Sequence, residues 1–353
     1  MENNTSFRVN LKSLSYDELE AFIVGLAVEK YRAQQIATWI FKHGVTSFQE
    51  MTNLSKDLRR RLETKSWISK PDIKTRLQSK RGDTVKYLFA LSDGQLVESV
   101  LMRHDYGRSV CVSTQVGCRY GCRLCASGLE GLVRSLDAGE IYDQVLGIEN
   151  DIGERISSLV IMGSGEPLDN YRATLVFIKN IAAPYGLNIG YRHITISTCG
   201  LVPGIRRLAA EGLPLTLAVS LHAPNDSLRD QLVPINKKYP LSELITASRD
   251  YVRETGRRIT FEYALVAGVN DSAGHARELC GLLQDILCHV NLIPANQVIE
   301  RGVKPPTKRQ IELFRSILES NMLTTTVRRE FGSDINAACG QLRRRILPGT
   351  SKK

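Results

Sequence analysis

The stretch CVSTQVGCRYGCRLCASG, residues 111–128, decides how this chain is interpreted. It begins with the β-branched residues of a strand and ends in a glycine-containing loop that carries Cys118, Cys122 and Cys125. A structural zinc site usually takes four ligands as two separated pairs, and the sequence has no second C-x₂-C or H-x₃-H pair. A four-iron cluster usually takes four thiolates, so three leave one iron open for another ligand. The spacing therefore favours an iron–sulfur cluster over zinc.

The composition is that of a globular protein. Of 353 residues, 42% are hydrophobic, enough to bury one large core and a smaller appendage. Lys and Arg number 47 against 37 Asp and Glu, and the net charge of +10 favours a polyanionic partner such as nucleic acid or an anionic membrane surface. The first residues lack an apolar signal segment, and no apolar run approaches the roughly 20 residues that span a bilayer. We therefore expect a cytoplasmic protein with no membrane partner.

From residue 109 onward, the sequence alternates between strands and helices. Runs rich in β-branched residues begin near residues 109, 158, 193, 215, 258, 289 and 324. Such alternation predicts a parallel sheet of right-handed β/α units, and the number of runs suits an incomplete (β/α)₆-type barrel better than a closed eightfold one. By analogy with closed barrels, the loops at the carboxyl ends of these strands should form the active site.

The C-x₃-C-x₂-C loop after the first barrel strand resembles that of the radical S-adenosylmethionine (SAM) superfamily, in which the open iron of a [4Fe-4S] cluster chelates SAM. The resemblance implies that Cys118, Cys122 and Cys125 hold this cluster. It also implies that the glycine-rich loop containing Gly165 and Glu166 accepts the SAM ammonium group. The other implied SAM contacts stand at equivalent strand ends: Ser197, Ser220, His222 and Asn296. For each of these, the alternative is a polar residue that caps a neighbouring helix.

Longer motifs narrow the resemblance. In order, they are CVSTQVGC, GSGEPLDNY, AVSLHAPND, RRITFEYALVAGVNDS, HVNLIP and TVRREFGSDINAACGQL. Together they are similar to the adenine-C2 RNA methyltransferases of the RlmN type, whose sister Cfr-type enzymes methylate carbon 8. The likeness runs from about residue 10 to residue 345. The chain departs from the family's usual residues at Cys199, where serine is usual, at Ser164, where methionine is common, and beside Asn296.

The chemistry of such a family needs further cysteines. Carbon 2 of adenine has no usable lone pair to attack a methyl cation, so the methyl group must arrive as a radical. The resemblance implies that one SAM methylates Cys339, and that a second yields a 5′-deoxyadenosyl radical that takes hydrogen from this methyl group. The carbon radical then adds to the ring and attaches the RNA to Cys339. Release needs a base for the ring proton, matched by Glu98, and a thiolate that forms a disulfide with Cys339, matched by Cys111.

Without the resemblance, both cysteines have plainer interpretations. Cys111 would be a small buried hydrophobe on a strand, and Cys339 an inert cysteine at a helix start.

The resemblance also implies the partners. The family's targets are an adenine in the peptidyl-transferase region of 23S ribosomal RNA and the adenine next to the anticodon in some tRNAs. Bases of folded RNA must be splayed out before an active site can reach them, and a basic protein suits the phosphates. We expect an electron donor such as flavodoxin or ferredoxin, and a monomer. The alternatives are a Cfr-type carbon-8 methyltransferase that confers antibiotic resistance, and a non-catalytic RNA-binding protein with a structural metal.

The chain divides into four segments. They are a helical accessory domain (1–70), a β-hairpin linker (71–108), the barrel with its catalytic C-terminal loop (109–345) and a basic tail (346–353). A capping box from Ser15 to Glu18 begins the first long helix. The basic run at 56–65 is a solvated helix face or, less commonly, an RNA contact. The Asp-Gly pair at 93–94 is a strong hairpin signal that puts Glu98 on the second strand.

Overall fold

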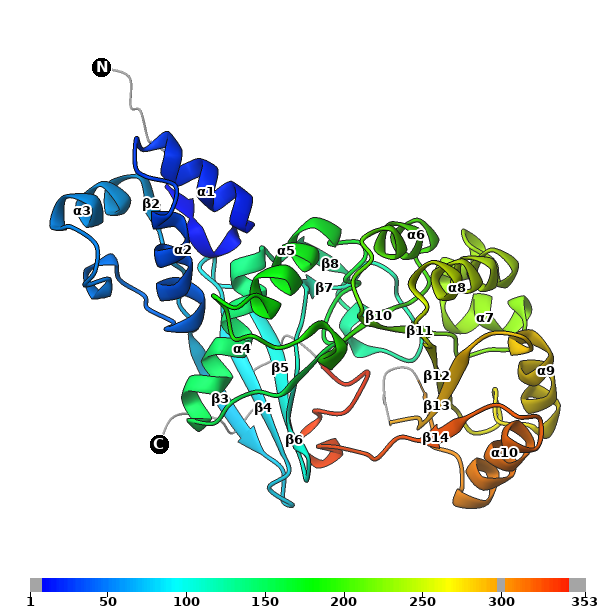
Figure 1. The fold of residues 1–353 in the computed structure, drawn as a ribbon. Helices are drawn as coiled ribbons and strands as arrows, with labels where there is room; N and C mark the ends of the chain where they lie inside the picture. Colours follow the sequence, from blue (N-terminus) through cyan, green and yellow to red (C-terminus); the bar gives the residue numbers. More distant parts are fainter. Residues whose placement is uncertain (1–7, 297–301, 343–353) are drawn as a thin grey trace.

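One long mixed sheet dominates the computed structural model, which describes residues 8–296 and 302–342 (Figure 1). Its strands are β3 (Ile73–Gln78), β4 (Thr84–Ala90), β5 (Leu96–His104), β6 (Gly107–Cys111), β9 (Ser158–Ile161), β10 (Ile194–Thr198), β11 (Thr216–Ser220), β12 (Ile259–Leu265), β13 (Cys288–Pro294) and β14 (Thr325–Val327). Their order is β14-β13-β12-β11-β10-β9-β6-β5-β4-β3. Neighbours from β6 to β14 are parallel, and those from β3 to β6 are antiparallel.

Helices link the parallel strands. They are α4 (Ala138–Ile152), α5 (Tyr171–Ala182), α6 (Val202–Ala210), α7 (Asp226–Leu232), α8 (Leu241–Thr255), α9 (Ala273–Leu283) and α10 (Lys308–Ser320). At least one lies in the chain between each two successive parallel strands, and Figure 1 shows them along the outside of the curved sheet. This arrangement confirms the predicted incomplete α/β barrel. None of the described helices is long and apolar enough to cross a bilayer.

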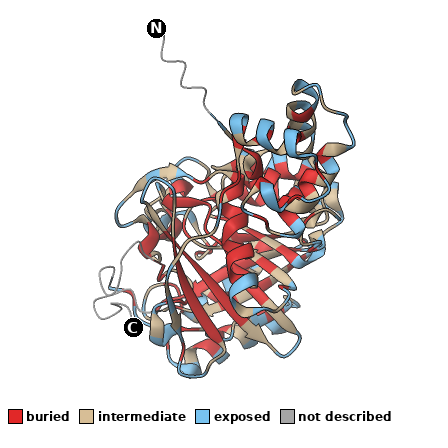
Figure 2. Cartoon of the chain, turned by 90° about the vertical axis from the view of Figure 1, so that its left-hand side faces the viewer, coloured by how far each residue is buried: buried red, intermediate tan, exposed pale blue. Residues whose placement is uncertain are grey.

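The predicted strands are buried to different extents: β9 and β10 alternate buried and half-buried residues, so one of their faces is more enclosed than the other. In β11 and β12, most residues are buried, as a parallel strand covered by helices requires. Figure 2 shows the buried residues along the central strands and the exposed ones at outer turns and helices. The predicted basic tail, 346–353, lies outside the described residues.

The hairpin turns at the predicted Asp-Gly pair, where Gly94 has φ +81°. Its second strand, β5, pairs with β6, so the segment predicted as a linker is part of the barrel's sheet. One face of these strands, which includes Tyr87 and Val97, packs into the main core. The other face bears Val100 and Cys111, which pack against the C-terminal loop, residues 328–342. The second strand of the hairpin, β5, therefore forms one wall of the space between the sheet and the C-terminal loop.

The N-terminal segment is mainly helical. Its elements are β1 (Val9–Asn10), α1 (Tyr16–Gly25), α2 (Arg32–Ala37), α3 (Lys56–Lys65) and β2 (Ser66–Trp67), and β1 pairs with β2. The predicted capping box from Ser15 to Glu18 is present at the start of α1. In α3, Leu58 and Leu62 are buried, whereas most of the basic side chains are exposed. The core of this segment is continuous with that of α4 and α5.

A buried ion pair joins the N-terminal segment to the barrel. Lys12 Nζ lies 2.5 Å from Asp143 Oδ1 of α4, and it also donates to the carbonyl oxygen of Ser69 at 2.8 Å. The Lys12 side chain is fully buried. A buried ammonium is stable only while paired, so this contact holds the 3-10 turn after β1, Leu11–Ser13, against α4.

Removing one partner of this pair should be more damaging than removing both. Asp143→Ala leaves the Lys12 ammonium without its counter-charge, and we expect the free energy of unfolding to fall by about 3–5 kcal/mol in urea denaturation. The double variant Lys12→Met/Asp143→Leu replaces both charges with apolar groups and should recover most of that loss. Wild-type stability of Asp143→Ala alone would contradict this account.

Candidate active site

Two adjoining cavities lie at the carboxyl ends of the parallel strands. Their volumes are about 180 Å³ and about 60 Å³. Cys125, Met162, Asn296, Arg328 and Cys339 line both, so the two spaces share a wall. The larger one is the cofactor cavity, and the smaller one is the thiol cavity.

The cysteine loop borders the cofactor cavity. It is enclosed by a small antiparallel pair, β7 (Gln115–Gly117) and β8 (Leu132–Ser135). Gly117 has φ +80°, and a Cβ there would lie 2.0 Å from the Gly131 carbonyl oxygen, so glycine is required before Cys118. Cys118, Cys122 and Cys125 all line the cavity. Burial raises the pKa of Cys118 to about 12 and raises that of Cys122 as well.

Three thiols directed to one cavity suit a [4Fe-4S] cluster with one iron left for SAM. Raised thiol pKa values are those of the free protein, because a coordinating thiol is deprotonated by its metal. In the described residues, no group of three His, Cys, Asp or Glu side chains is close enough to share a single ion. A cluster does not need such a group, since each thiolate binds a different iron.

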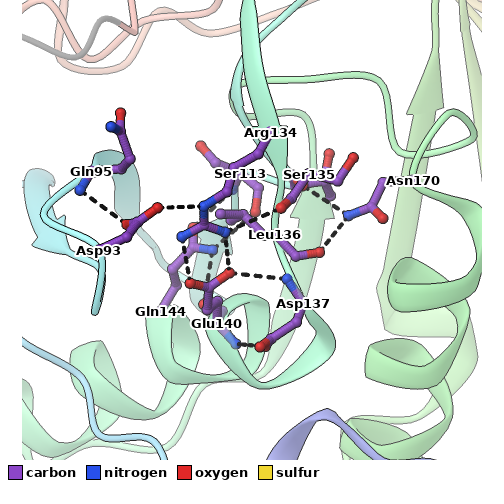
Figure 3. A network of polar contacts seen from close by, with 11 residues as sticks. Asp93, Gln95, Ser113, Arg134, Ser135, Leu136, Asp137, Glu140, Gln144 and Asn170 are labelled. Atoms are coloured by element: carbon purple, nitrogen blue, oxygen red, sulfur yellow. Dashed lines mark hydrogen bonds and ion pairs between the residues drawn. The ribbon is translucent and has the colours of Figure 1, made fainter.

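A buried polar network fixes the backbone on both sides of the cysteine loop (Figure 3). Gln144 of α4 accepts from the Ser113 amide and donates to the Ser113 carbonyl oxygen, both at 2.9 Å. Asn170 donates to the carbonyl oxygens of Thr114, at 2.9 Å, and Leu136, at 2.7 Å. The loop is therefore anchored to α4 and α5 rather than held by its own turns. Ion pairs extend the network to Asp93, Arg134 and Glu140.

The glycine-rich loop after β9 forms the next wall. Gly165 has φ +105°, and a Cβ there would lie 2.6 Å from Gln115, so the loop packs directly on the strand of the cysteine loop. The Glu166 carboxylate accepts from the amides of Leu168, at 3.0 Å, and Cys199, at 2.8 Å. Burial raises the pKa of Glu166, and these hydrogen bonds oppose that rise. The carboxylate is thus fixed in the cavity wall, where its remaining lone pairs suit an ammonium group.

The other predicted SAM contacts line the same cavity. They are Ser197, Ser220, His222 and Asn296. Nδ1 of His222 accepts from the Ala264 amide at 3.0 Å, and burial lowers the pKa of His222 to about 3. The ring is therefore neutral, with its proton on Nε2 as a donor. The side-chain amide of Asn296 donates to the Cys339 carbonyl oxygen at 3.1 Å, so Asn296 supports the C-terminal loop as well.

Cys111 and Cys339 both line the thiol cavity, and both are free thiols here. Burial raises the pKa of Cys111 to about 12. The loop of Cys339 is held against the cysteine loop, because the Ala126 amide donates to the Gly340 carbonyl oxygen at 2.7 Å. The structure thus brings together two cysteines 228 positions apart in the chain, between residues 111 and 339.

Glu98 is on the same face of β5 as Val100, two residues earlier in the strand. Val100 lines the thiol cavity, whereas Glu98 is not among its lining residues. Oε1 of Glu98 lies 2.9 Å from Lys86 Nζ, and both side chains are almost fully buried. Lys86 also donates to the carbonyl oxygen of Asn336, at 3.3 Å, in the loop that carries Cys339. The ion pair therefore holds the Glu98 carboxylate beside the loop that carries Cys339.

Two charged residues in the walls were missed by the sequence analysis. Arg328 follows β14 and lines both cavities, and Glu262 of β12 lines the cofactor cavity. Cys339 raises the pKa of Arg328, and Glu262 and Cys111 act in the same direction. The sequence offered one signal for these residues, a charged residue within or at the end of an apolar strand. Glu262 is such a residue in TFEY, and Arg328 is one in TVRRE. Lys86 in TVKYLFA carries the same signal.

Arg229 of α7 braces the carboxyl ends of β10 and β11. This fully buried guanidinium donates to the carbonyl oxygens of Cys199 at 2.7 Å, Leu221 at 3.1 Å and Ser220 at 3.2 Å, and to Asn236 at 2.8 Å. Burial lowers the pKa of Arg229 to about 10, so it remains a cation at neutral pH. The fork of guanidinium donors thereby holds the strand ends that carry Ser197 and Ser220.

Comparison with known proteins extends over nearly the whole chain. Residues 9–68 match the ribosomal RNA large subunit methyltransferase N-terminal domain, and residues 112–280 match the radical SAM superfamily. The chain is 65% identical over 340 residues to a probable dual-specificity RNA methyltransferase RlmN of Pelotomaculum thermopropionicum, covering 96% of this chain and 92% of that relative. A relative of the same name from Alkaliphilus oremlandii is 53% identical, with 96% and 99% covered.

A solved structure is similar as well. It is the crystal structure of a radical SAM methyltransferase from Sphaerobacter thermophilus, which is 46% identical. The two superpose with a TM-score of 0.90, over 96% of this chain and 100% of that one.

Arg229→Met should loosen the wall of the cofactor cavity. It leaves several buried carbonyl oxygens without their donor, so we expect the free energy of unfolding to fall by about 3 kcal/mol in urea denaturation. Arg253→Met is the matched control, because Arg253 is 73% exposed and pairs only at the surface of α8. Its change should stay within about 0.5 kcal/mol. Equal stability of the two variants would show that Arg229 does not brace these strands.

Proposed function

Because the chain belongs to the RlmN family of radical SAM RNA methyltransferases, as its motifs predicted, we propose that it methylates carbon 2 of adenine. The targets we propose are an adenine in the peptidyl-transferase region of 23S ribosomal RNA and the adenine next to the anticodon in some tRNAs. Its relatives are named probable dual-specificity RNA methyltransferases, which supports more than one RNA substrate. Membership in this family excludes the alternative of a non-catalytic RNA-binding protein.

The observation that carries the proposal is the juxtaposition of two thiols with a cofactor cavity. Cys111 and Cys339 line one cavity, and Cys339 also lines the cavity of the cysteine loop. A methyl group on the Cys339 sulfur would therefore stand at the shared wall. That position suits the hydrogen abstraction that radical methylation requires.

The walls fit the two cofactors. Cys118, Cys122 and Cys125 would hold the [4Fe-4S] cluster. Gly165 and Glu166 would take the SAM ammonium group, and the remaining polar contacts would come from Ser197, Ser220, His222 and Asn296. With the cluster held there, two SAM molecules bound in succession during one turnover would supply one methyl group and one 5′-deoxyadenosyl radical. The neutral His222 ring offers its Nε2–H to the cofactor as a donor.

The thiols and the carboxylate then complete the transfer. Cys339 carries the methyl group, and after addition the RNA is bonded to its sulfur through a methylene. Glu98 takes the proton from carbon 2, and the unpaired electron of the adduct would return to the oxidised cluster, which restores the aromatic ring. The ion pair with Lys86 holds the Glu98 carboxylate close to the loop of Cys339. The Cys111 thiolate attacks the Cys339 sulfur, the sulfur–methylene bond breaks, and the methylene takes a proton to become the methyl product. The resulting disulfide is reduced before the next turnover.

We also propose an electron donor, an oligomeric state and a cellular location for this enzyme. The electron for the cluster would come from a flavodoxin or ferredoxin, and the enzyme would act as a monomer in the cytoplasm. The net charge of +10 supports a large contribution of phosphate contacts to RNA affinity.

The proposed regiochemistry is tested by the product. Unmodified 23S RNA is incubated anaerobically with reconstituted enzyme, SAM and a reductant, and its nucleosides are compared by mass spectrometry with 2-methyl- and 8-methyladenosine standards. We expect 2-methyladenosine. The appearance of 8-methyladenosine would retain the radical chemistry and reassign the enzyme to the Cfr type.

The roles of the two thiols are separable by substitution. Cys111→Ala removes the attacking thiolate, so the RNA should remain attached to Cys339 and appear as an RNA–protein adduct in denaturing gels after anaerobic turnover. The control Cys111→Ala/Cys339→Ala has no attachment point and should give no adduct. If Cys111→Ala released methylated RNA as the wild type does, Cys111 would not be the resolving thiol.

A further inference from the structure

A ladder of aromatic rings leads from the thiol cavity to the protein surface. Phe331 of the C-terminal loop lines that cavity. The His104 ring meets Phe331 edge-on, with centroids 4.9 Å apart and planes at 70°. The Tyr106 ring stacks on His104 at 4.7 Å, with planes 13° apart. The outermost ring, that of Tyr106, is 81% exposed.

The backbone presents this tyrosine to solvent. Strands β5 and β6 are paired as far as His104 and Gly107. Asp105 and Tyr106 therefore form a two-residue turn between β5 and β6, separate from the turn at Gly94. A stacked ring has two faces. His104 covers one face of Tyr106, and the exposure of the residue leaves the other to solvent. Single exposed apolar side chains are common, but a stack continuous with a substrate cavity is a different feature.

The chemistry of the ladder fits an unpaired base better than an apolar protein segment. Burial lowers the pKa of His104, so the ring beneath Tyr106 is a neutral stacking partner. Cations stand close by: Arg329 lies over Phe331 at 5.1 Å, and Lys80 and Arg81 are exposed in the turn between β3 and β4. That turn touches the C-terminal loop, since the Lys80 amide donates to Asp334 at 2.9 Å. Asp83 pairs with Arg329, and the exposed side chains of Lys80 and Arg81 in the same turn can contact phosphates.

We infer that an unpaired RNA base beside the target adenine stacks on the exposed face of Tyr106 while the adenine enters the thiol cavity. This inference rests on the proposed function, because it takes RNA as the substrate. Aromatic rings bind splayed bases by stacking and tolerate any sequence, since every base has a π face. Tyr106 would then hold the strand at the mouth of the site, outside the bond-making steps, so it is a positioning residue.

The test is RNA binding by the full-length, cluster-loaded protein without SAM. The probe is a short RNA stem–loop with 2-aminopurine next to the loop adenine, because stacking quenches the fluorescence of this base. Tyr106→Ala should weaken binding about 5- to 30-fold and abolish the quenching. Tyr106→Trp keeps a stacking ring and should retain both within about twofold. Leu313→Ala, a 51% exposed residue of α10 at the opposite edge of the sheet, is the surface control and should change neither.

The outcomes separate this inference from the proposed function. Wild-type affinity and quenching in Tyr106→Ala would overturn the stacking role even if 2-methyladenosine forms. An equal loss of affinity for a fully paired RNA duplex would overturn it as well, because a duplex offers no splayed base. If the variants behave as expected but the product is not 2-methyladenosine, the stacking role stands and the regiochemistry fails.

Discussion

The position of β6 is the constraint on which the rest of the site depends. This strand pairs antiparallel with β5 on one side and parallel with β9 on the other, so it joins the hairpin to the barrel in one hydrogen-bonded sheet. The register places Val100 opposite Cys111, which brings the wall that bears Glu98 beside the thiol at the end of β6. A shift of one residue would turn Cys111 toward the opposite face of the sheet, away from the C-terminal loop.

The C-terminal loop covers the side of the thiol cavity that the sheet does not enclose. Its backbone is tied to the cysteine loop through Ala126 and Gly340, and to the hairpin through Lys86 and Asn336. These ties are hydrogen bonds, and Ala337 and Leu342 of the same loop add apolar packing against the face that bears Val100 and Cys111. The loop also contributes Phe331 and Arg329 to the lining of the thiol cavity, so the placement of Cys339 and one wall of that cavity depend on one segment.

Buried charge is concentrated around these cavities. Arg229, Glu166 and the Lys86–Glu98 pair are nearly inaccessible, and each is satisfied by backbone groups or an opposite charge. The buried Lys12–Asp143 pair follows the same rule far from the cavities, where it joins two parts of the core. Such groups destabilise a fold unless their partners are in place, so their geometry is narrowly determined.

Hydrophobic periodicity and local spacing are properties of short segments, so they predicted the fold class, the parallel β/α strands of the barrel and the three-cysteine loop. The motifs, which follow one another in the family's order, identified the family. The union of the hairpin with the barrel came only from the tertiary structure, which also brought Cys111 and Cys339, linked before only by the family resemblance, to one cavity. The same holds for Lys86, Glu262 and Arg328, each a charge whose surroundings come from distant segments. Side chains that act together across the chain are brought together only by the register of the sheet and the closure of the C-terminal loop.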